Sequence, residues 1–323
     1  MMNDVEEVKE YCENEDIKFI RLAFCDVYGR QKNISVMPSE LKRAFEDGIA
    51  FDGSAVRGFG DITSSDLFLR PDPATLAVLP WRPEQQRVAR MYCSVFTPDG
   101  GIHEGDTRSL LKRAVKAAGD KGVKILFGRG FELAMSNAEN GGVIADRGGY
   151  MDMAPLDSCE NFRRELCLTL EKMGIPTESS HHGMMNGQNR FAFAPADALK
   201  AADDTLTFLT AARAVAAGFG MTSEPVYSSF RISAATHDGH VTDENNSIGR
   251  RIAEITPFLS RESDRCEIEY SGNGRLDLRG ISVNPYLLFS LVIYAYIDDI
   301  ESLPGTAGLI GRHLPRSVIR AYS

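Results

Sequence analysis

The sequence lacks the features that mark several specialised classes of protein. It has a single Trp, no CxxC pair among its six cysteines, and a most apolar stretch (285–297) shorter than the ~20 residues that span a bilayer. The N-terminal residues are acidic, whereas a secretory signal begins with positive charge. These absences argue against a disulfide scaffold, a membrane protein and a secreted protein, and we expect reduced thiols and a cytoplasmic location.

Positive charge is also scarce in this chain. Lys and Arg number 36 against 45 Asp and Glu, and the formal net charge of −9 argues against a broad face for nucleic acid or membrane. With 323 residues, 43% of them hydrophobic, the chain is long and apolar enough for two domains or one large one. We therefore expect a small-molecule protein with neither nucleic acid nor membrane as a partner.

The hydrophobic pattern of the first third predicts a small α+β domain. Apolar and polar residues alternate over 17–24 and 31–36 on either side of a Tyr28-Gly29 turn, as in a half-buried hairpin. Helices are expected at Val5–Asn14, 40–46 and 107–118, and further strands at 76–79 and 88–95. A Pro- and Gly-containing loop at 97–101 places the boundary near residue 105, which gives domains 1–105 and 106–323.

The second part alternates strands with longer helices. A strand is expected at 123–127 and helices at 160–173, 195–218 and 285–300. Apolar residues recur every three or four positions in the helix at 195–218, so one side of it should face the core. The adjacent Asp203 and Asp204 are interpreted as part of its solvated side.

Several motifs are more specific than this pattern. The segment 51–60 (FDGSAVRGFG) is followed by SDLFLRPDPAT at 65–75 and LPWR at 79–82. Further segments follow in the order GDTRSLLKR (105–113), GYMDMAP (149–155), ENFRR (160–164), ESSHH (178–182) and NPYL (284–287). Together these motifs, spread over nearly the whole chain, resemble the glutamine synthetase family.

The resemblance implies an α+β fold with an N-terminal β-grasp domain and a C-terminal catalytic domain. In the catalytic domain a curved antiparallel sheet forms a half-barrel backed by helices, and here this domain is shortened. The family uses ATP to phosphorylate the γ-carboxylate of glutamate, and ammonia then displaces the phosphate. Several Glu carboxylates hold the Mg²⁺ or Mn²⁺ ions that neutralise the transferring phosphoryl group.

The chain departs from the family at these metal ligands. Glu132 matches one ligand of the first metal motif, but Gly130 stands in the place of the other. In the second motif Gly183 and Arg190 replace two glutamates. The shorter Asp277 stands where a fifth glutamate is expected. Two carboxylates cannot supply the usual oxygen ligands of these ions unless water or substrate supplies the rest.

Other family positions are kept or altered. Arg279 matches a residue that binds the substrate carboxylate, Asp52 matches the ammonium-site residue, and Tyr150, His181 and His182 match the substrate pocket. Asp52 is equally explained as a turn residue that accepts backbone N–H bonds, and adjacent strand residues such as His181 and His182 face opposite ways. Further matches to the family are interpreted as packing or subunit-contact positions: Trp81, Tyr150, Asn161, Asn284 and Tyr286. His237 and His240 have no assigned role.

Three hypotheses follow from the resemblance. The first is a catalytically deficient homologue with an assembly, regulatory or sensing role, which needs no cofactor. The second is an ATP- and Mg²⁺- or Mn²⁺-dependent carboxylate–amine ligase with a rearranged site. The third is a partner subunit that completes its site beside another protein, such as an active synthetase. In each case the family implies a ring-type homo-oligomer, hexamer or dodecamer, in which the β-grasp domain of one subunit meets the half-barrel of the next.

Overall fold

The computed structural model describes residues 5–59, 66–144, 146–236, 239–240, 252, 267–271, 275–279, 284–298, 310 and 313–322. The chain divides into two compact units. The first comprises Met1–Arg113 with Ile310–Ser323, and the second comprises Ala114–Leu309.

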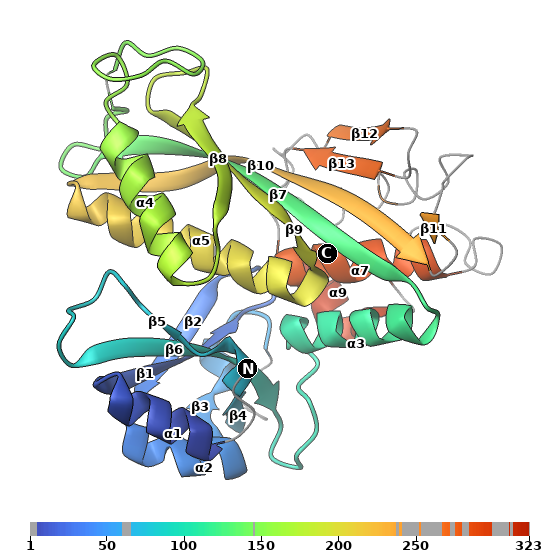
Figure 1. The fold of residues 1–323 in the computed structure, drawn as a ribbon. Helices are drawn as coiled ribbons and strands as arrows, with labels where there is room; N and C mark the ends of the chain where they lie inside the picture. The colour runs from blue at the N-terminus through green and yellow to red at the C-terminus, as the bar shows by residue number, and fades with distance from the viewer. Residues whose placement is uncertain are drawn as a thin grey trace. The chain divides into compact units, whose positions relative to one another are not determined.

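The first unit is built on a mixed sheet of six strands in the order β2-β1-β6-β4-β3, with β5 paired to β6 (Figure 1). The strands are β1 (Ile17–Cys25), β2 (Gln31–Val36), β3 (Ile49–Asp52), β4 (Asp66–Pro71), β5 (Ala77–Val78) and β6 (Arg87–Phe96). Only β1 and β6 are paired in parallel. Helices α1 (Val5–Asn14) and α2 (Leu41–Glu46) contact each other and this sheet. Buried residues such as Leu22, Leu41 and Met91 form the core, and the arrangement is the expected β-grasp domain.

The boundary between the two units lies at residue 113, within helix α3 (Thr107–Asp120). The sequence predicted a domain boundary near residue 105. The first unit also includes the end of the chain, for which the sequence carried no expectation. Helix α9 (Arg316–Tyr322) is held by two reciprocal bonds: the Tyr28 hydroxyl donates to the Ala321 carbonyl (2.7 Å) and the Tyr322 hydroxyl donates to the Val27 carbonyl (2.8 Å).

The second unit is built on an antiparallel sheet of seven strands in the order β12-β13-β10-β7-β9-β8, with β11 paired to β10. The strands are β7 (Lys124–Asn137), β8 (Thr177–His182), β9 (Gln188–Asp197), β10 (Met221–Thr236), β11 (Gly239–His240), β12 (Glu267–Ser271) and β13 (Arg275–Arg279). Helix α5 (Ala198–Gly218) packs on β7, β9 and β10, and α4 (Glu160–Lys172) and α7 (Pro285–Ile297) flank it (Figure 1). This is the helix-backed curved sheet that the resemblance predicts.

The core of this unit contradicts one interpretation made from the sequence. Asp203 and Asp204 are buried rather than solvated. Asp203 accepts a hydrogen bond from the Tyr286 hydroxyl (2.7 Å), and Asp204 forms ion pairs with Arg129 (2.8 Å) and Lys200 (2.9 Å). The reason is that α5 packs against a sheet, α4 and α7 at once, so its polar side is also covered and must find polar partners inside.

Asn284 and Tyr286, two of the residues predicted to support packing, are buried at the start of α7. The Asn284 side chain accepts from the Tyr286 backbone N–H (3.0 Å) and caps the helix, and both residues are buried. Trp81 is half-buried, whereas Asn161 and Tyr150 are exposed and contribute no core packing. Five cysteines lie among the described residues and all are free, and burial raises the pKa of the Cys12 thiol to about 11.

Within the ranges described above, no helix combines the length and the apolar character needed to cross a bilayer.

Candidate functional site

Four adjacent strands place the predicted metal-motif residues in two rows across the sheet. Glu132 on β7 pairs in register with Arg190 on β9, which pairs with His181 on β8. One row along, Gly130 lies opposite Ala192 and opposite Ser229 on β10, and Ala192 lies opposite Ser179. Residues directly opposite, or two apart along a strand, share one face of a sheet. The register therefore collects residues from β7, β8, β9 and β10 on a single face.

These residues line a cavity of about 150 Å³. Its walls are formed by Gly130, Phe131, Glu132, Ser179, His181, Arg190, Phe191, Ala192 and Ser229. We call the polar side chains among them (Glu132, Ser179, His181, Arg190 and Ser229) the cavity cluster. Ser179 belongs to the ESSHH motif, but the sequence assigned no role to it or to Ser229, and the strand register brings both beside the predicted residues.

The central feature of the cavity cluster is an ion pair. Arg190 Nε lies 2.7 Å from Glu132 Oε1, with the two side chains 38% and 17% exposed. The sequence predicts Glu132 as a retained metal-ligand position and Arg190 as a position where a ligand is replaced. The carboxylate is therefore neutralised by the residue that replaced its fellow ligand.

The other two lost ligand positions are filled by neighbouring atoms. A Cβ at Gly130 would lie 2.5 Å from Ser229 Oγ. A Cβ at Gly183 would lie 2.5 Å from Gln188 Cβ and 2.9 Å from its Oε1. Because Gly183 N–H also donates to the Gln188 carbonyl (2.8 Å), the turn between β8 and β9 is closed too tightly for a side chain at position 183.

The last predicted ligand and the substrate arginine lie on β13. Asp277 pairs in register with Arg231 of β10, and Arg279 pairs with Ser229, which puts Arg279 in the same row as Gly130. The side chains of Asp277, Arg279 and His240 lie outside the described part of the structure, as does His237 entirely.

His181 and Tyr150 lie together beside the cavity. The His181 ring meets Tyr150 edge to face at a centroid distance of 5.0 Å and an angle of 80°. His181 Nδ1 lies 2.8 Å from the His182 carbonyl and therefore donates to it, which leaves Nε2 without a proton in the neutral ring. Tyr150 itself is 52% exposed and is not part of the cavity wall.

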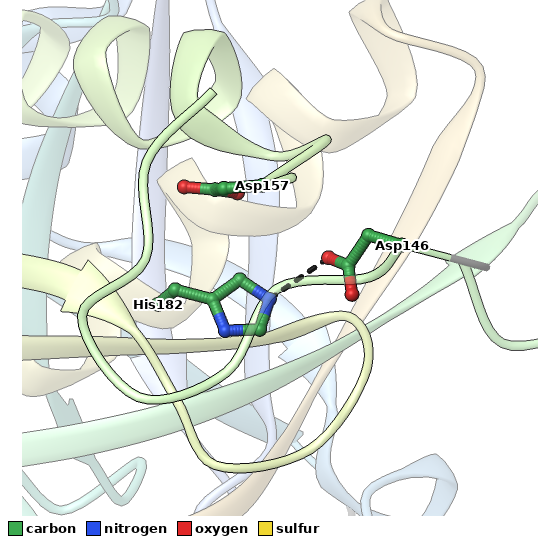
Figure 2. A group of neighbouring side chains, drawn as sticks. All are labelled: Asp146, Asp157 and His182. Carbon is green, nitrogen blue, oxygen red and sulfur yellow. Dashed lines mark hydrogen bonds and ion pairs between the residues drawn. The ribbon is translucent and has the colours of Figure 1, made fainter. Parts of the chain in front are cut away.

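His182 turns away from the cavity, as the alternation of a strand requires. It is fully buried, and its Nε2 lies 2.8 Å from Asp146 Oδ2 (Figure 2). Its Nδ1 lies 2.9 Å from the Gly183 carbonyl. The predicted grouping of His181 and His182 in one pocket is thus separated into two environments. Burial lowers the pKa of His182, but the bonds to Asp146 and Gly183 outweigh it, so that this pKa is raised above its usual value.

The surroundings of His182 form a second charged group, which we call the buried cluster: Asp146, Asp157, Arg163, His182 and Asn189. Asp157 is ion-paired with Arg163 and accepts the Cys159 backbone N–H (2.8 Å), and Arg163 also donates to Asn189 (2.7 Å). Burial raises the pKa of Asp157, but the bonds from Arg163 and Cys159 outweigh it and lower this pKa overall.

Within the described residues, the ligand atoms of Asp146, Asp157 and His182 are close enough to suggest a metal site, all lying within 4.8 Å of one another. The bonding pattern argues against it. Nδ1 of His182 faces a carbonyl and therefore donates to it, and Nε2 is already engaged by Asp146 Oδ2, so this geometry leaves neither nitrogen free for a metal ion. We therefore interpret the buried cluster as structural.

Asp52 lies in the first unit, at the end of β3. Its carboxylate accepts from the Ser54 backbone N–H (2.9 Å) and the Ser54 hydroxyl (2.6 Å), and these bonds lower its pKa. It caps the short 3₁₀ turn Gly53–Ala55, which is the structural interpretation offered by the sequence.

Comparison with known proteins identifies the family of both units. The family described as "Glutamine synthetase, beta-Grasp domain" matches residues 16–98, and "Glutamine synthetase, catalytic domain" matches residues 104–226. The glutamine synthetase of Clostridium saccharobutylicum is 38% identical over 220 residues, which cover 67% of this chain and 50% of that protein. The glutamine synthetase of Methanococcus maripaludis is 40% identical over 230 residues, covering 68% and 52%.

A solved structure shares the fold over more of the chain. The cryo-EM structure of Plasmodium falciparum glutamine synthetase superposes with a TM-score of 0.79 at 16% identity, covering 93% of this chain and 76% of that one. The chain spans about half the length of the curated relatives it matches. The matched family domains follow in order through residue 226 and the fold agrees beyond it, and the chain belongs to the glutamine synthetase family.

Proposed function

We propose that this chain is a member of the glutamine synthetase family that does not carry out the metal-dependent ligase reaction and has kept the fold for assembly, regulation or ligand sensing. The observation that carries the proposal is the Arg190–Glu132 ion pair at 2.7 Å. By the resemblance, Arg190 stands where the family has a metal-binding glutamate, so its positive charge would take the place of the divalent cation that the family's reaction needs. Phosphoryl transfer depends almost entirely on positioning and charge neutralisation, so the loss of several ligands is expected to remove the activity.

The residues of the cavity do not fit the metal ions that the family implies. A divalent ion of this kind takes about six oxygen ligands. Glu132 is the only carboxylate lining the described cavity, and its Oε1 is already engaged. The crowding at Gly183 supports the same conclusion, because a Cβ there would lie 2.5 Å from Gln188 Cβ, and glycine at 130 and 183 supplies no carboxylate.

The direct test is a calorimetric titration of the purified protein with ATP in the presence of Mg²⁺ or Mn²⁺, followed by an assay for glutamine formation from glutamate and ammonia. We expect neither saturable, metal-dependent binding nor product. A binding heat that disappears in Glu132→Ala, but persists in Glu224→Ala, would overturn the proposal. Glu224 is a matched control because it is also ion-paired with an arginine, Arg213 (3.1 Å), yet lies outside the cavity wall.

A second candidate is the ligase itself with a rearranged site. The observation in its favour is that relatives called glutamine synthetase are 38–40% identical over about two thirds of the chain. This function would require ATP, Mg²⁺ or Mn²⁺, and release of Glu132 from Arg190. The same titration separates the two candidates, because only the ligase needs nucleotide and metal together.

Self-assembly is the part of the family's behaviour that we expect this chain to retain. Two loops expose large apolar side chains: Met151 and Met153 lie between β7 and α4, and Met184 and Met185 lie between β8 and β9, all 58–74% exposed. Met151 N–H bonds the His182 carbonyl (3.2 Å), which ties the two loops together. Exposed apolar patches of this kind commonly mark protein interfaces, and flexible Met side chains adapt to a partner.

We propose that this patch takes part in a ring-type homo-oligomer. Sedimentation velocity at micromolar concentration is expected to give an oligomer, and Met184→Lys with Met185→Lys to weaken it. A monomer for the unmodified chain would contradict the assembly proposal and favour the partner-subunit hypothesis, in which an active synthetase supplies the neighbouring subunits.

A further inference from the structure

We propose that the cavity binds a small oxyanion, a phosphate or carboxylate group, directly through Arg190 and the hydroxyls of Ser179 and Ser229, with no divalent cation between. This inference rests on the proposed loss of the metal site, because the two occupants would use the same space.

The first support is the balance of hydrogen-bonding groups around the cavity. Arg190 contributes five N–H donors, of which Glu132 engages Nε, and the two serines contribute a hydroxyl each. Among the described residues of the wall, Glu132 is the single carboxylate, and the serine hydroxyls and the Nε2 lone pair of a neutral His181 ring can also accept. Arg190 carries the one fixed positive charge of this described lining, and the N–H donors that it keeps beyond Nε are available to an anion.

The second support is the arrangement of these donors. Arg190 and His181 lie in one register row, and Ser179 and Ser229 lie in the next row on the same face, contributed by strands β8 and β10 on either side of β9 and β7. The donors therefore surround the cavity from several strands. Gly130 lies between the serines and has no side chain, which leaves Ser229 Oγ at the surface of the space that a side chain there would occupy.

The third support is the size and the access of the site. A cavity of about 150 Å³ is well below the ~300–1,000 Å³ of pockets that hold drug-sized ligands, so it suits a small ion rather than a nucleotide. Arg190 is 38% exposed, so its guanidinium can be reached from solvent. The planar guanidinium matches the oxygen atoms of phosphate and of carboxylate equally well, so its chemistry alone does not distinguish these two classes of ligand.

The test is isothermal titration of the full chain with inorganic phosphate and, separately, with acetate, in chloride buffer containing EDTA. We expect saturable binding of at least one of the two, and the one that binds identifies the source. Arg190→Gln should weaken binding at least tenfold, and Arg190→Lys should lose less because it retains the charge but not the fork. Glu132→Gln should tighten binding several-fold, because the guanidinium is then no longer shared.

The control is Arg213→Gln, which removes an ion-paired arginine outside the cavity and should leave binding unchanged. Thermal melts of each variant check that it is folded. The inference is overturned if neither anion binds the unmodified chain, or if Arg190→Gln binds as well as the unmodified chain. Anion binding that requires Mg²⁺ would overturn both this inference and the proposed function, whereas absence of anion, ATP and metal binding together would overturn only this inference.

Discussion

The cavity cluster and the buried cluster contain adjacent residues of one strand but differ in solvent access and in how their charged groups are paired. His181 and His182 are adjacent on β8, yet one borders an open cavity and the other is buried beside Asp146. In the buried cluster Arg163 is paired with Asp157 and Asn189, and both His182 nitrogens face oxygen atoms, whereas Asp146 Oδ1 is buried without a hydrogen-bond partner. In the cavity cluster Arg190 meets a single carboxylate through one nitrogen. A charged group whose bonds are completed internally supports the fold, whereas one with donors to spare is available to a ligand.

The largest expected effect comes from breaking the buried cluster. Arg163→Met leaves Asp157 buried without its ion-pair partner, and removing one member of such a pair costs about 3–5 kcal/mol of unfolding free energy. Urea denaturation of this variant measures the loss. The matching Arg213→Met, at an exposed pair, should cost less than about 1 kcal/mol. Equal losses for the two variants would contradict the structural role of the buried cluster.

The pH dependence of stability sharpens the same comparison. Because the folded pKa of His182 is raised above its unfolded value, its contribution is fully present below about pH 6.5 and is lost as the pH rises through the folded pKa. Asp146→Asn removes the hydrogen-bonding carboxylate and leaves only Asp157 as a nearby negative group. The variant should therefore be least stable, relative to the unmodified chain, below pH 6.5, with the difference narrowing at higher pH. Chemical denaturation at a series of pH values tests this, and a constant difference would refute it.

Two glycine substitutions test whether the lost ligand positions are closed. Gly183→Ala forces its Cβ against Gln188 Cβ, next to the backbone, and should cost about 1–3 kcal/mol. Gly130→Ala meets the hydroxyl of Ser229, which can rotate away, and should cost less. Thermal melts compare the two variants. The reverse order would mean that the turn at Gly183 has room for a carboxylate and would weaken the argument against a metal site.

The smallest stability effect is expected in the cavity cluster itself. Glu132→Gln breaks a pair whose members are 17% and 38% exposed, and water can replace the lost partner, so the unfolding free energy should change by about 1 kcal/mol or less. The same variant is expected to change anion affinity several-fold. A change in stability as large as that of Arg163→Met would assign the Arg190–Glu132 pair to the fold rather than to a ligand site.

Much of the secondary structure was predictable from local pattern. The helix Val5–Asn14 agrees end to end, and the strand expected at 17–24 is β1 (Ile17–Cys25). The strand expected at 123–127 is only the beginning of β7, which continues to Asn137. The continuation reads GRGFELAMSN, in which the glycines and charged residues weaken the strand signal. These residues form a strand because β9 and β10 pair along both of its edges.

The candidate site was predictable only in part. The motif order predicted Glu132 as a retained ligand position and Gly130, Gly183 and Arg190 as replaced ones, but no local pattern indicated that Arg190 would pair with Glu132, 58 positions away in sequence. No role was predicted for Ser179 or Ser229, because their place in the cavity depends on which residues lie opposite them in a sheet. The burial of Asp203 and Asp204 was missed for the same reason, since it depends on how many elements pack against α5.

Motifs and hydrophobic periodicity are local properties of the chain, so the family, the order of the elements and the predicted ligand replacements could be inferred from the sequence alone. The tertiary structure was needed to show which of these positions are crowded, which charges meet and which of two adjacent histidines faces the cavity. Those outcomes depend on strand register and on packing between distant segments, and a single residue of register shift would exchange the two faces of the sheet.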